Sequence, residues 1–383
     1  MPEDKAKTKK QSFVDLMEDN TQYIDNDIIN AVKDFKIGDV VAGQTLDWVD
    51  WVWGDNDDVK TDFWHDSDLH GYSGNDILYS HGLGHQKQRG GDGKDILFAI
   101  GATTDLAGGN GDDLIMGFAA YNDISGGDGD DFIAASGGDN DISGGSGRDI
   151  IVASGVDNWV DGDGGADKLI VFGVRNVVHG GDGDDKIRSL GGSSTLKGQD
   201  GDDEILALGG HNEIEGGAGR DDIEAGGIYN EIDGGSGADD IKALAGLNTI
   251  WGGDGDDFIK TGGGSNVVYA GQNADTVLAL GGNNWIEGGG GGDELIAIGG
   301  ANEMFGGSGR DTLVGIGAAN LQYGEGDDDT MVAVGLSNLQ WGGSGADNLF
   351  ALGGFNVQMG EGGNDILVAG GAANLQHGGS GGD

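Results

Sequence analysis

The chain has 383 residues, of which 84 are Gly and one is Pro, and its formal net charge is −47, from 67 acidic and 20 basic residues. Glycine at this level without an every-third-residue period and without proline excludes collagen, and so acidic a chain is expected to repel nucleic acid and anionic membranes. It contains no Cys, so neither disulfides nor thiolate metal sites are expected, and no stretch approaches the roughly 18 apolar residues needed for membrane insertion.

Residues 1–52 form an N-terminal segment that lacks the repeats found further on. Two stretches, SFVDLMEDN and NDIINAVKDF, have apolar spacing typical of helices, with Asn26 or Asp27 as candidate N-caps. We expect a small helical or mixed cap, or an attachment region, that covers the open edge of the first coil. The opening stretch MPEDKAKTKKQSF contains no apolar run, so no Sec-type signal peptide is predicted.

Residues 53–89 are expected to form irregular first coils. The stretch GYSGNDILY (71–79) is one good copy of the later repeat and carries Asp76, whereas WGDNDDVKT (53–61) is at best a worn copy.

Residues 90–383 divide into seventeen frames of 18 residues, which start at Gly90 and continue without insertion or deletion. The fourth position of the frame is Gly except at Asn273 and Asp327, and the eighth is always a large aliphatic residue or Met. The sixth position is Asp in every frame: Asp95, Asp113, Asp131, Asp149, Asp167, Asp185, Asp203, Asp221, Asp239, Asp257, Asp275, Asp293, Asp311, Asp329, Asp347, Asp365 and Asp383. So regular a spacing predicts a solenoid in which these aspartates stack in one column.

The chemistry of this phrase points to calcium. Glycines allow positive φ angles, so a six-residue turn can curl with its carbonyls directed at one place, and Ca²⁺ takes six to eight oxygen ligands from carbonyls and carboxylates. With coils about 4.8 Å apart, each ion is expected between neighbouring turns and shared by the Asp of one coil and carbonyls of the next. About sixteen ions, one per gap, would bring the net charge of −47 to about −15. The alternative is that these turns are merely solvated corners of a solenoid.

The repeated phrase Gly-Gly-x-Gly-x-Asp-x-aliphatic-x resembles the nonapeptide of the RTX family, the hemolysin-type calcium-binding repeats. The resemblance implies an all-β fold, a right-handed parallel β-roll or β-helix solenoid with 18-residue coils. It also implies Ca²⁺ ligation by the sixth-position aspartates and by Asp76, and a bacterial protein that leaves the cell by type I secretion and folds on calcium outside. Because the chain stops at GGSGGD, a turn with no strand after it, we also expect a truncated sequence.

The second half of each frame departs from the family pattern. Position 15 is Asn in fourteen of the sixteen complete frames, with Thr104 and Ser194 as the exceptions. Stacked amides can donate to one neighbour and accept from the other, which would give an uncharged ladder along this edge. The alternative is that these Asn only favour the turn conformation.

Two columns have open interpretations. Position 18 includes Trp251, Tyr269, Phe305, Tyr323 and Trp341, which form either an outward row suited to a polysaccharide or a partner chain, or packing at a coil corner. Positions 9 and 11 form apolar pairs such as Leu278/Leu280 and Val332/Val334, which lie either in an outward ribbon suited to assembly or in the core.

The last four complete frames exchange apolar and polar residues at positions 16 and 17, as in Leu321-Gln322 and Leu339-Gln340. Because such an exchange reverses the face that each residue uses, we expect a local change of cross-section or a specialised surface there.

No HExxH motif, nucleophile elbow or P-loop is identified, so no enzyme is predicted. We predict a secreted or cell-surface calcium-binding β-roll with a structural or adhesive role, which forms filaments or a lattice. The alternatives are the secretion and folding module of a larger RTX toxin or enzyme, and a glycan-binding rod that uses the aromatic column.

Overall fold

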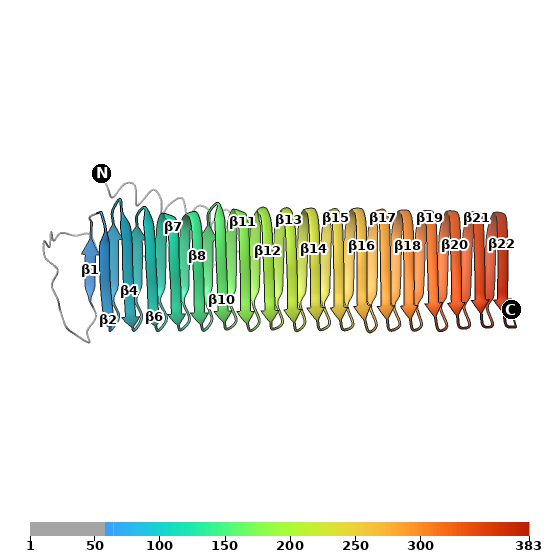
Figure 1. Cartoon of the computed structure of the whole chain (residues 1–383), viewed down its shortest axis with the longest axis horizontal. Coiled ribbons are helices and arrows are strands. Elements are labelled where there is room, and N and C mark those ends of the chain that lie inside the picture. Colours follow the sequence, from blue (N-terminus) through green and yellow to red (C-terminus); the bar gives the residue numbers. More distant parts are fainter. Residues whose placement is uncertain (1–57, 64, 383) are drawn as a thin grey trace. The chain divides into compact units, whose positions relative to one another are not determined.

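The computed structural model describes residues 58–63 and 65–382, so the predicted cap at 1–52 and Asp383 lie outside the described residues. The described residues form a 22-stranded parallel sheet that winds into a solenoid of about 18 turns (Figure 1). No helix occurs in this part of the chain. The predicted all-β parallel solenoid with 18-residue coils is therefore confirmed.

The strands are 4 to 8 residues long in the first coils and 15 residues long in the later ones. They are β1 (Val59–Asp62), β2 (Ser67–Ser73), β3 (Ile77–His81), β4 (His85–Asp92), β5 (Ile96–Ile100), β6 (Thr103–Asn110), β7 (Leu114–Asp128), β8 (Phe132–Ser146), β9 (Ile150–Ser154), β10 (Asp157–Gly164), β11 (Lys168–Asp182), β12 (Lys186–Asp200), β13 (Glu204–Ala218), β14 (Asp222–Ser236), β15 (Asp240–Asp254), β16 (Phe258–Gln272), β17 (Thr276–Gly290), β18 (Glu294–Ser308), β19 (Thr312–Gly326), β20 (Thr330–Ser344), β21 (Asn348–Gly362) and β22 (Ile366–Ser380).

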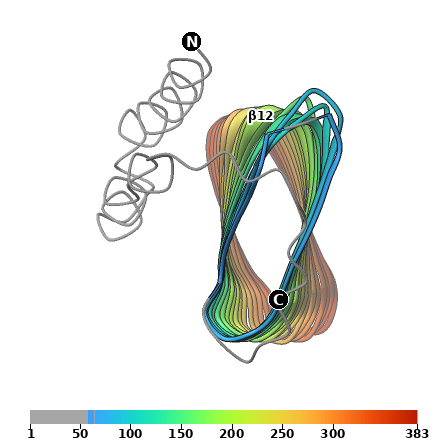
Figure 2. The same ribbon diagram turned by 90° about the vertical axis from the view of Figure 1, so that its left-hand side faces the viewer.

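Each later coil consists of one long strand and one tight turn. β13, for example, begins directly after Asp203 and runs for 15 residues, until the turn residues Gly219 to Asp221 reverse the chain. Two flat walls result, and they meet at two edges (Figure 2). We call the edge made by the Gly-rich turns the turn edge, and the edge where the strand bends near position 15 the Asn edge.

The register of the coils follows the 18-residue repeat. Ile214, for example, pairs with Leu196 on one side and Ile232 on the other. One coil near the start is a residue longer, because Ile77 pairs with Ile96, whereas Val59 pairs with Ile77 at the 18-residue step. From β4 onward, His85 pairs with Thr103 and the 18-residue step is kept. Like positions therefore stack directly on one another along the axis.

The core is made of a few inward columns. Residues at positions 8 and 17, such as Ile205 and Ile214, face each other from the two walls and are at most 2% exposed. Small residues such as Ala207 fill position 10 between them. Burying one aliphatic side chain of this size contributes about 1.5–3 kcal/mol, so the columns bind neighbouring coils together while the polar edges remain outside the apolar interior.

Candidate metal centre

The backbone of the turn edge adopts left-handed conformations at positions 2 and 4. Gly217 and Gly219 have φ angles of 121° and 126°. The same conformation occurs where Gly is replaced, with φ of 85° at Gln199, 80° at Asn273 and 72° at Asp327. The two replacements at position 4 thus keep the turn shape, at the strain that a side chain adds in this region.

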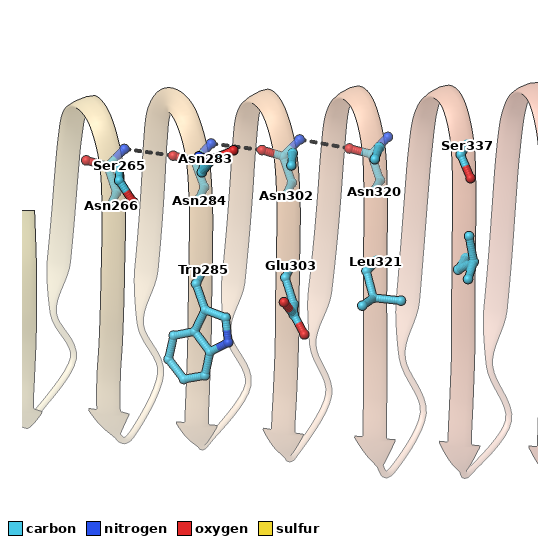
Figure 3. Close-up of a pocket in the computed structure, with 13 residues that line it drawn as sticks. Ser265, Asn266, Asn283, Asn284, Trp285, Asn302, Glu303, Asn320, Leu321 and Ser337 are labelled. Carbon is cyan, nitrogen blue, oxygen red and sulfur yellow. Dashed lines mark hydrogen bonds between the residues drawn. The ribbon is translucent and has the colours of Figure 1, made fainter. Parts of the chain in front are cut away.

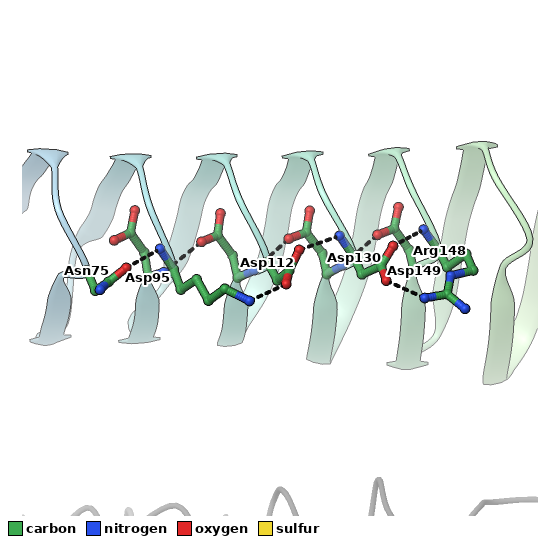
Figure 4. Close-up of polar contacts among 9 residues, drawn as sticks. Asn75, Asp95, Asp112, Asp130, Arg148 and Asp149 are labelled. Atoms are coloured by element: carbon green, nitrogen blue, oxygen red, sulfur yellow. Dashed lines mark hydrogen bonds and ion pairs between the residues drawn. The ribbon is translucent and has the colours of Figure 1, made fainter.

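The aspartates at position 6 lie in one buried column. Oδ1 of Asp113 accepts a hydrogen bond from the backbone N–H of Asp95 at 2.7 Å, and Oδ1 of Asp131 accepts one from Asp113 at 2.7 Å. The same link repeats up to Asp365, whose Oδ1 accepts from the N–H of Asp347 at 3.0 Å. Figure 4 shows part of this column, with Asp95 and Asp149 labelled. The predicted column of stacked aspartates is therefore present over the described residues.

The second oxygen of these carboxylates is buried without a hydrogen-bond partner. This holds for Oδ2 of Asp95, Asp113, Asp131, Asp149, Asp167, Asp185, Asp203, Asp221, Asp239, Asp257, Asp275, Asp293, Asp311, Asp329 and Asp347. An unpaired buried carboxylate oxygen is costly, and a whole column of them indicates a site for a positive ligand.

A small cradle lies beside these oxygens wherever position 1 is Gly. A Cβ atom built on Gly198 would lie well under 3.0 Å from Oδ2 of Asp203 and from the carbonyl oxygen of Gly216, in the next coil. The same pair of oxygens surrounds Gly180, where they belong to Asp185 and Gly198. Glycine at position 1 therefore leaves open a space onto which one carboxylate and one carbonyl of the next coil converge.

The surroundings favour the neutral form of these acids when no cation is present. Burial is the main cause that raises the pKa of Asp113 and Asp131 to about 7; neighbouring carboxylates contribute to this shift, and a backbone hydrogen bond opposes it. Burial likewise raises the pKa of Asp275 and Asp329 to about 8. Keeping the column ionised at neutral pH consequently requires a compensating positive charge.

The donor set fits a hard divalent cation. Orphaned carboxylate oxygens, carbonyl oxygens and a cradle that a Cβ would fill are what Ca²⁺ requires. In the part of the chain that the structure describes, no three His, Cys, Asp or Glu side chains gather into a metal cluster. A site here would instead take one carboxylate per coil and complete its shell with backbone carbonyls.

Comparison with known families agrees with this geometry. The chain matches the model described as RTX calcium-binding nonapeptide repeat (4 copies) over residues 104–133, 122–151, 143–170, 175–196, 197–227, 233–268, 269–297, 279–313, 296–331 and 341–376. The chain belongs to the RTX family. No curated protein matches it.

One turn of this RTX roll departs from the cradle geometry. The stretch AGQNAD (270–275) carries Ala270 at position 1 and Asn273 at position 4. Ala270 is fully buried, so its methyl group occupies the space that glycine leaves open elsewhere. Asp275, in the same turn, has one of the most strongly raised pKa values, because it is buried beside neighbouring carboxylates.

A second column of side chains, at position 5, lies on the exposed side of the turn edge. It was not identified from the sequence. Oδ1 of Asp112 accepts the backbone N–H of Asp130 at 3.1 Å, and Oδ1 of Asp130 accepts that of Arg148 at 2.9 Å (Figure 4). These bonds run in the opposite sense to those of position 6. The sequence does contain a signal for this column, because the residue directly before the buried Asp is frequently acidic or an amide.

The Asn edge carries the predicted amide ladder. Nδ2 of Asn284 donates to Oδ1 of Asn302 at 2.8 Å, and Asn302 donates in turn to Asn320 at 2.8 Å (Figure 3). The ladder runs from Asn122 to Asn176 and again from Asn212 to Asn374. These Asn are buried up to Asn356, so the edge is held by hydrogen bonds and not only by a preference for turns.

The two exceptions affect the ladder differently. Thr104 donates its hydroxyl to Oδ1 of Asn122 at 2.7 Å and so begins the ladder. Ser194 interrupts it, because Asn176 donates instead to Ser189 at 2.8 Å. Oδ1 of Asn212, the next amide, is then buried without a hydrogen-bond partner.

The aromatic residues of position 18 face outward and stack on one another. The rings of Trp251 and Tyr269 are 5.8 Å apart at 3°, and those of Tyr323 are 4.9 Å from Phe305 at 4° and 4.8 Å from Trp341 at 13°. A sugar ring binds to an aromatic face, but the faces between these neighbours are already covered. Along these stacks the column offers ring edges to a partner.

From Leu278 onward the apolar residues of positions 9 and 11 also lie on the outer side, as the first of the two alternatives predicted, whereas Met116 and Ile170, at position 9 of earlier coils, are buried. The expected change of cross-section at positions 16 and 17 is wrong. Gln322, Gln340 and Gln358 point inward and are fully buried, while Leu321 takes the outward side. Nε2 of Gln340 donates to Oε1 of Gln322 at 2.7 Å, which makes a second amide ladder inside the core.

The reason is that register is set by the neighbouring columns. Turning Gln322 outward would require a slip of one residue, and that slip would also expose Asn320 and break its ladder bonds. Because Gln322 also donates to the backbone oxygens of Leu313 at 3.0 Å and Val332 at 3.1 Å, its amide is satisfied inside. Hydrogen bonding thus overrides the rule that the apolar residue of a pair turns inward.

Proposed function

We propose that this RTX chain is a structural rod outside the bacterial cell, which folds on calcium and associates side by side with a second copy. RTX repeats bind calcium, are typical of secreted bacterial proteins and are generally non-catalytic. Among the described residues, no helix is long and apolar enough to cross a membrane. The buried carboxylate column supports the calcium requirement, and one face of the solenoid supports the association.

This face comprises the outward residues at positions 7, 9, 11 and 13 between Thr276 and Ala372, and we call it the uncharged face. Its members include Leu280, Ile298, Ile316, Val334 and Leu352, which are between 38% and 61% exposed. Glu294 is its one charged residue. In a chain with a net charge of −47, so large an area with a single charged residue is the observation that carries the proposal.

The same columns are charged in the coils just before it. Lys186 and Arg188 pair with Glu204 at 2.6 and 2.9 Å, and Lys242 pairs with Asp222 at 3.3 Å. Such cross-coil pairs keep a sheet face solvated. Beyond Lys260 they stop, and the outward positions become aliphatic.

The size of the uncharged face suits a second copy of the chain. It covers the six coils of β17 to β22, and coils about 4.8 Å apart with about 3.3 Å per residue make it roughly 650 Å². A standard interface buries about 800 Å² per partner. Two copies related by a two-fold axis would cover each other's face and keep their acidic turn edges apart from it.

Sedimentation of the full chain in calcium tests the proposal. We expect the wild type to be dimeric or larger at tens of micromolar, and Ile298→Glu with Ile316→Glu to be monomeric with an unchanged β spectrum. The matched control is Leu190→Glu with Leu208→Glu, in the same column of the charged coils, which should associate like the wild type. A monomeric wild type, or equal behaviour of both double variants, would overturn the proposed association.

A further inference from the structure

The aromatic column contains one ring that does not follow the stack. At position 18 the series of rings is interrupted by Glu287. Trp285, at position 16 of the same coil, fills this gap: its ring centroid lies 4.9 Å from that of Tyr269 and 5.6 Å from that of Phe305. Six aromatic rings from Trp251 to Trp341 therefore form a continuous contact chain on the outer side of this wall.

Trp285 is tilted relative to both neighbours, by 58° against Tyr269 and 47° against Phe305. It lies between the buried residues Asn284 and Ile286 in the strand, so its side chain is on the outward side. Figure 3 shows the indole broadside, roughly parallel to the sheet. The Trp285 side chain is half-buried and lies flat against neither neighbour, whereas the stacked rings of the column cover one another.

The half-buried ring of Trp285 borders a groove along the Asn edge. The groove has a volume of about 410 Å³, and its floor is the run of short side chains at position 14: Ser265, Asn283, Ala301, Ala319 and Ser337. The same column carries the large side chains of Leu247 and Phe355 on either side of this run, both about half exposed. The run of short residues therefore ends at a bulky residue in each direction.

Polar groups of the groove surround the ring. Glu303 pairs in register with Trp285 in the next coil, and Asn283 stands two residues before the ring in its own strand. A flat aromatic face beside carboxylate, amide and hydroxyl groups matches the apolar face and the polar rim of a pyranose ring. No Lys or Arg lines the groove, so nothing there would attract an anionic sugar.

From this arrangement we propose that the groove at Trp285 binds a neutral oligosaccharide. One pyranose ring lies on the outward face of Trp285, with its hydroxyl groups hydrogen-bonded to Glu303 and Asn283. The strong negative charge of the chain excludes acidic glycans from the same site. The stacked rings from Phe305 to Trp341 position Trp285 from one side but offer no platform of their own.

Titration calorimetry of the full chain in calcium tests this site with cellohexaose, maltohexaose, chitohexaose and mannohexaose as probes. We expect at least one probe to bind, and Trp285→Ala to weaken that binding by tenfold or more. The matched control is Trp341→Ala, which removes the same side chain from a stacked position and should change the affinity less than threefold. Ala301→Leu, which fills the floor and keeps the ring, should also weaken binding.

Two results would overturn the proposal: no binding of any of the four probes, or equal losses in the two tryptophan variants. Because the groove and the uncharged face lie on opposite walls of the coil, the binding assay is repeated on the monomeric Ile298→Glu/Ile316→Glu protein. Sugar binding that persists there separates this site from the proposed association.

Discussion

The backbone N–H of Asp95 donates to Oδ1 of Asp113, one coil further on, at 2.7 Å, while Oδ2 of Asp113 is buried and has no hydrogen-bond partner. The two oxygens of each carboxylate thus have different roles. One oxygen links neighbouring coils, and the other faces the cradle of its own turn. The link makes the column part of the fold, so cation binding and folding are coupled.

We predict that acid can partly replace calcium. Burial raises the pKa of Asp113 and Asp131 to about 7 and that of Asp275 to about 8, well above the value near 3.8 of a solvated Asp. The metal-free fold therefore binds protons that the unfolded chain releases, and its stability is fully present below about pH 4 and is lost as the pH rises through 6 to 8. Circular dichroism of metal-free protein should show β structure at pH 4.5 and its loss by pH 8. Saturating calcium should abolish this loss; metal-free stability that increases with pH would contradict the idea.

Removing the charge of one buried carboxylate at position 6 should reduce the number of bound calcium ions. Removing the charge of the exposed carboxylate before it, at position 5, should not. Asp203→Asn keeps an oxygen for the N–H of Asp185 but removes the charge at the cradle. We expect the calcium stoichiometry from titration calorimetry to fall by one or two ions and the calcium midpoint of folding to rise. The control is Asp202→Asn, next in sequence, where the exposed side chain accepts the N–H of Arg220 at 2.8 Å and an amide oxygen can do the same. Equal stoichiometry in the two variants would show that the inner column does not hold the ions.

The turn at Ala270 should be a deficient site that one substitution restores. Ala270→Gly removes the methyl group that fills the cradle beside Asp275, and we expect one additional calcium ion per chain and a lower calcium midpoint. Ala279→Gly is the control, because it removes a buried methyl group from the core column and should destabilise by about 0.5–1 kcal/mol without changing the stoichiometry. An unchanged ion count in Ala270→Gly would mean that the methyl group does not block the site.

The amide ladder of the Asn edge should carry a large share of local stability. Asn302→Ala leaves Nδ2 of Asn284 and Oδ1 of Asn320 buried without their ladder partners, at about 1–3 kcal/mol each. We therefore expect a loss of about 2–5 kcal/mol in the free energy of unfolding in calcium. Asn283→Ala, at the exposed residue directly before Asn284, should stay within about 0.5 kcal/mol. A similar small change in both variants would show that the ladder is not stabilising.

Much of this arrangement is predictable from residue spacing alone. A repeat of fixed length forces like residues into columns, so the Asp column and the Asn ladder follow from their identity and period. The orientation of Trp285 does not, because it depends on the missing ring at Glu287 one column away. The burial of Gln322 was also unpredictable from alternation, since it requires knowing that Leu313 and Val332 present acceptors to its amide.

The buried Gln ladder gives the last prediction, a contrast between single and combined replacement. Gln340→Met removes the donor to Oε1 of Gln322 and the acceptor of Nε2 of Gln358, so we expect a loss of about 1–3 kcal/mol in the free energy of unfolding. Replacing Gln322, Gln340 and Gln358 together by Met should recover most of that loss. Met304 already occupies this column, fully buried, in the preceding coil.

The backbone groups explain why the combined variant is tolerated. The earlier 18-residue frames have an apolar residue (Ile, Val, Leu or Met) at position 17, so they offer no side-chain amide to these backbone oxygens. Replacing the three buried Gln together removes the donors and the acceptors of the ladder at once, and only Nε2 of the exposed Gln376 loses its acceptor. Calcium-saturated denaturant titrations of the single and triple variants measure the difference. A triple variant that loses about three times as much as the single one would show that each Gln stabilises its own coil independently, and that the ladder is not a cooperative unit.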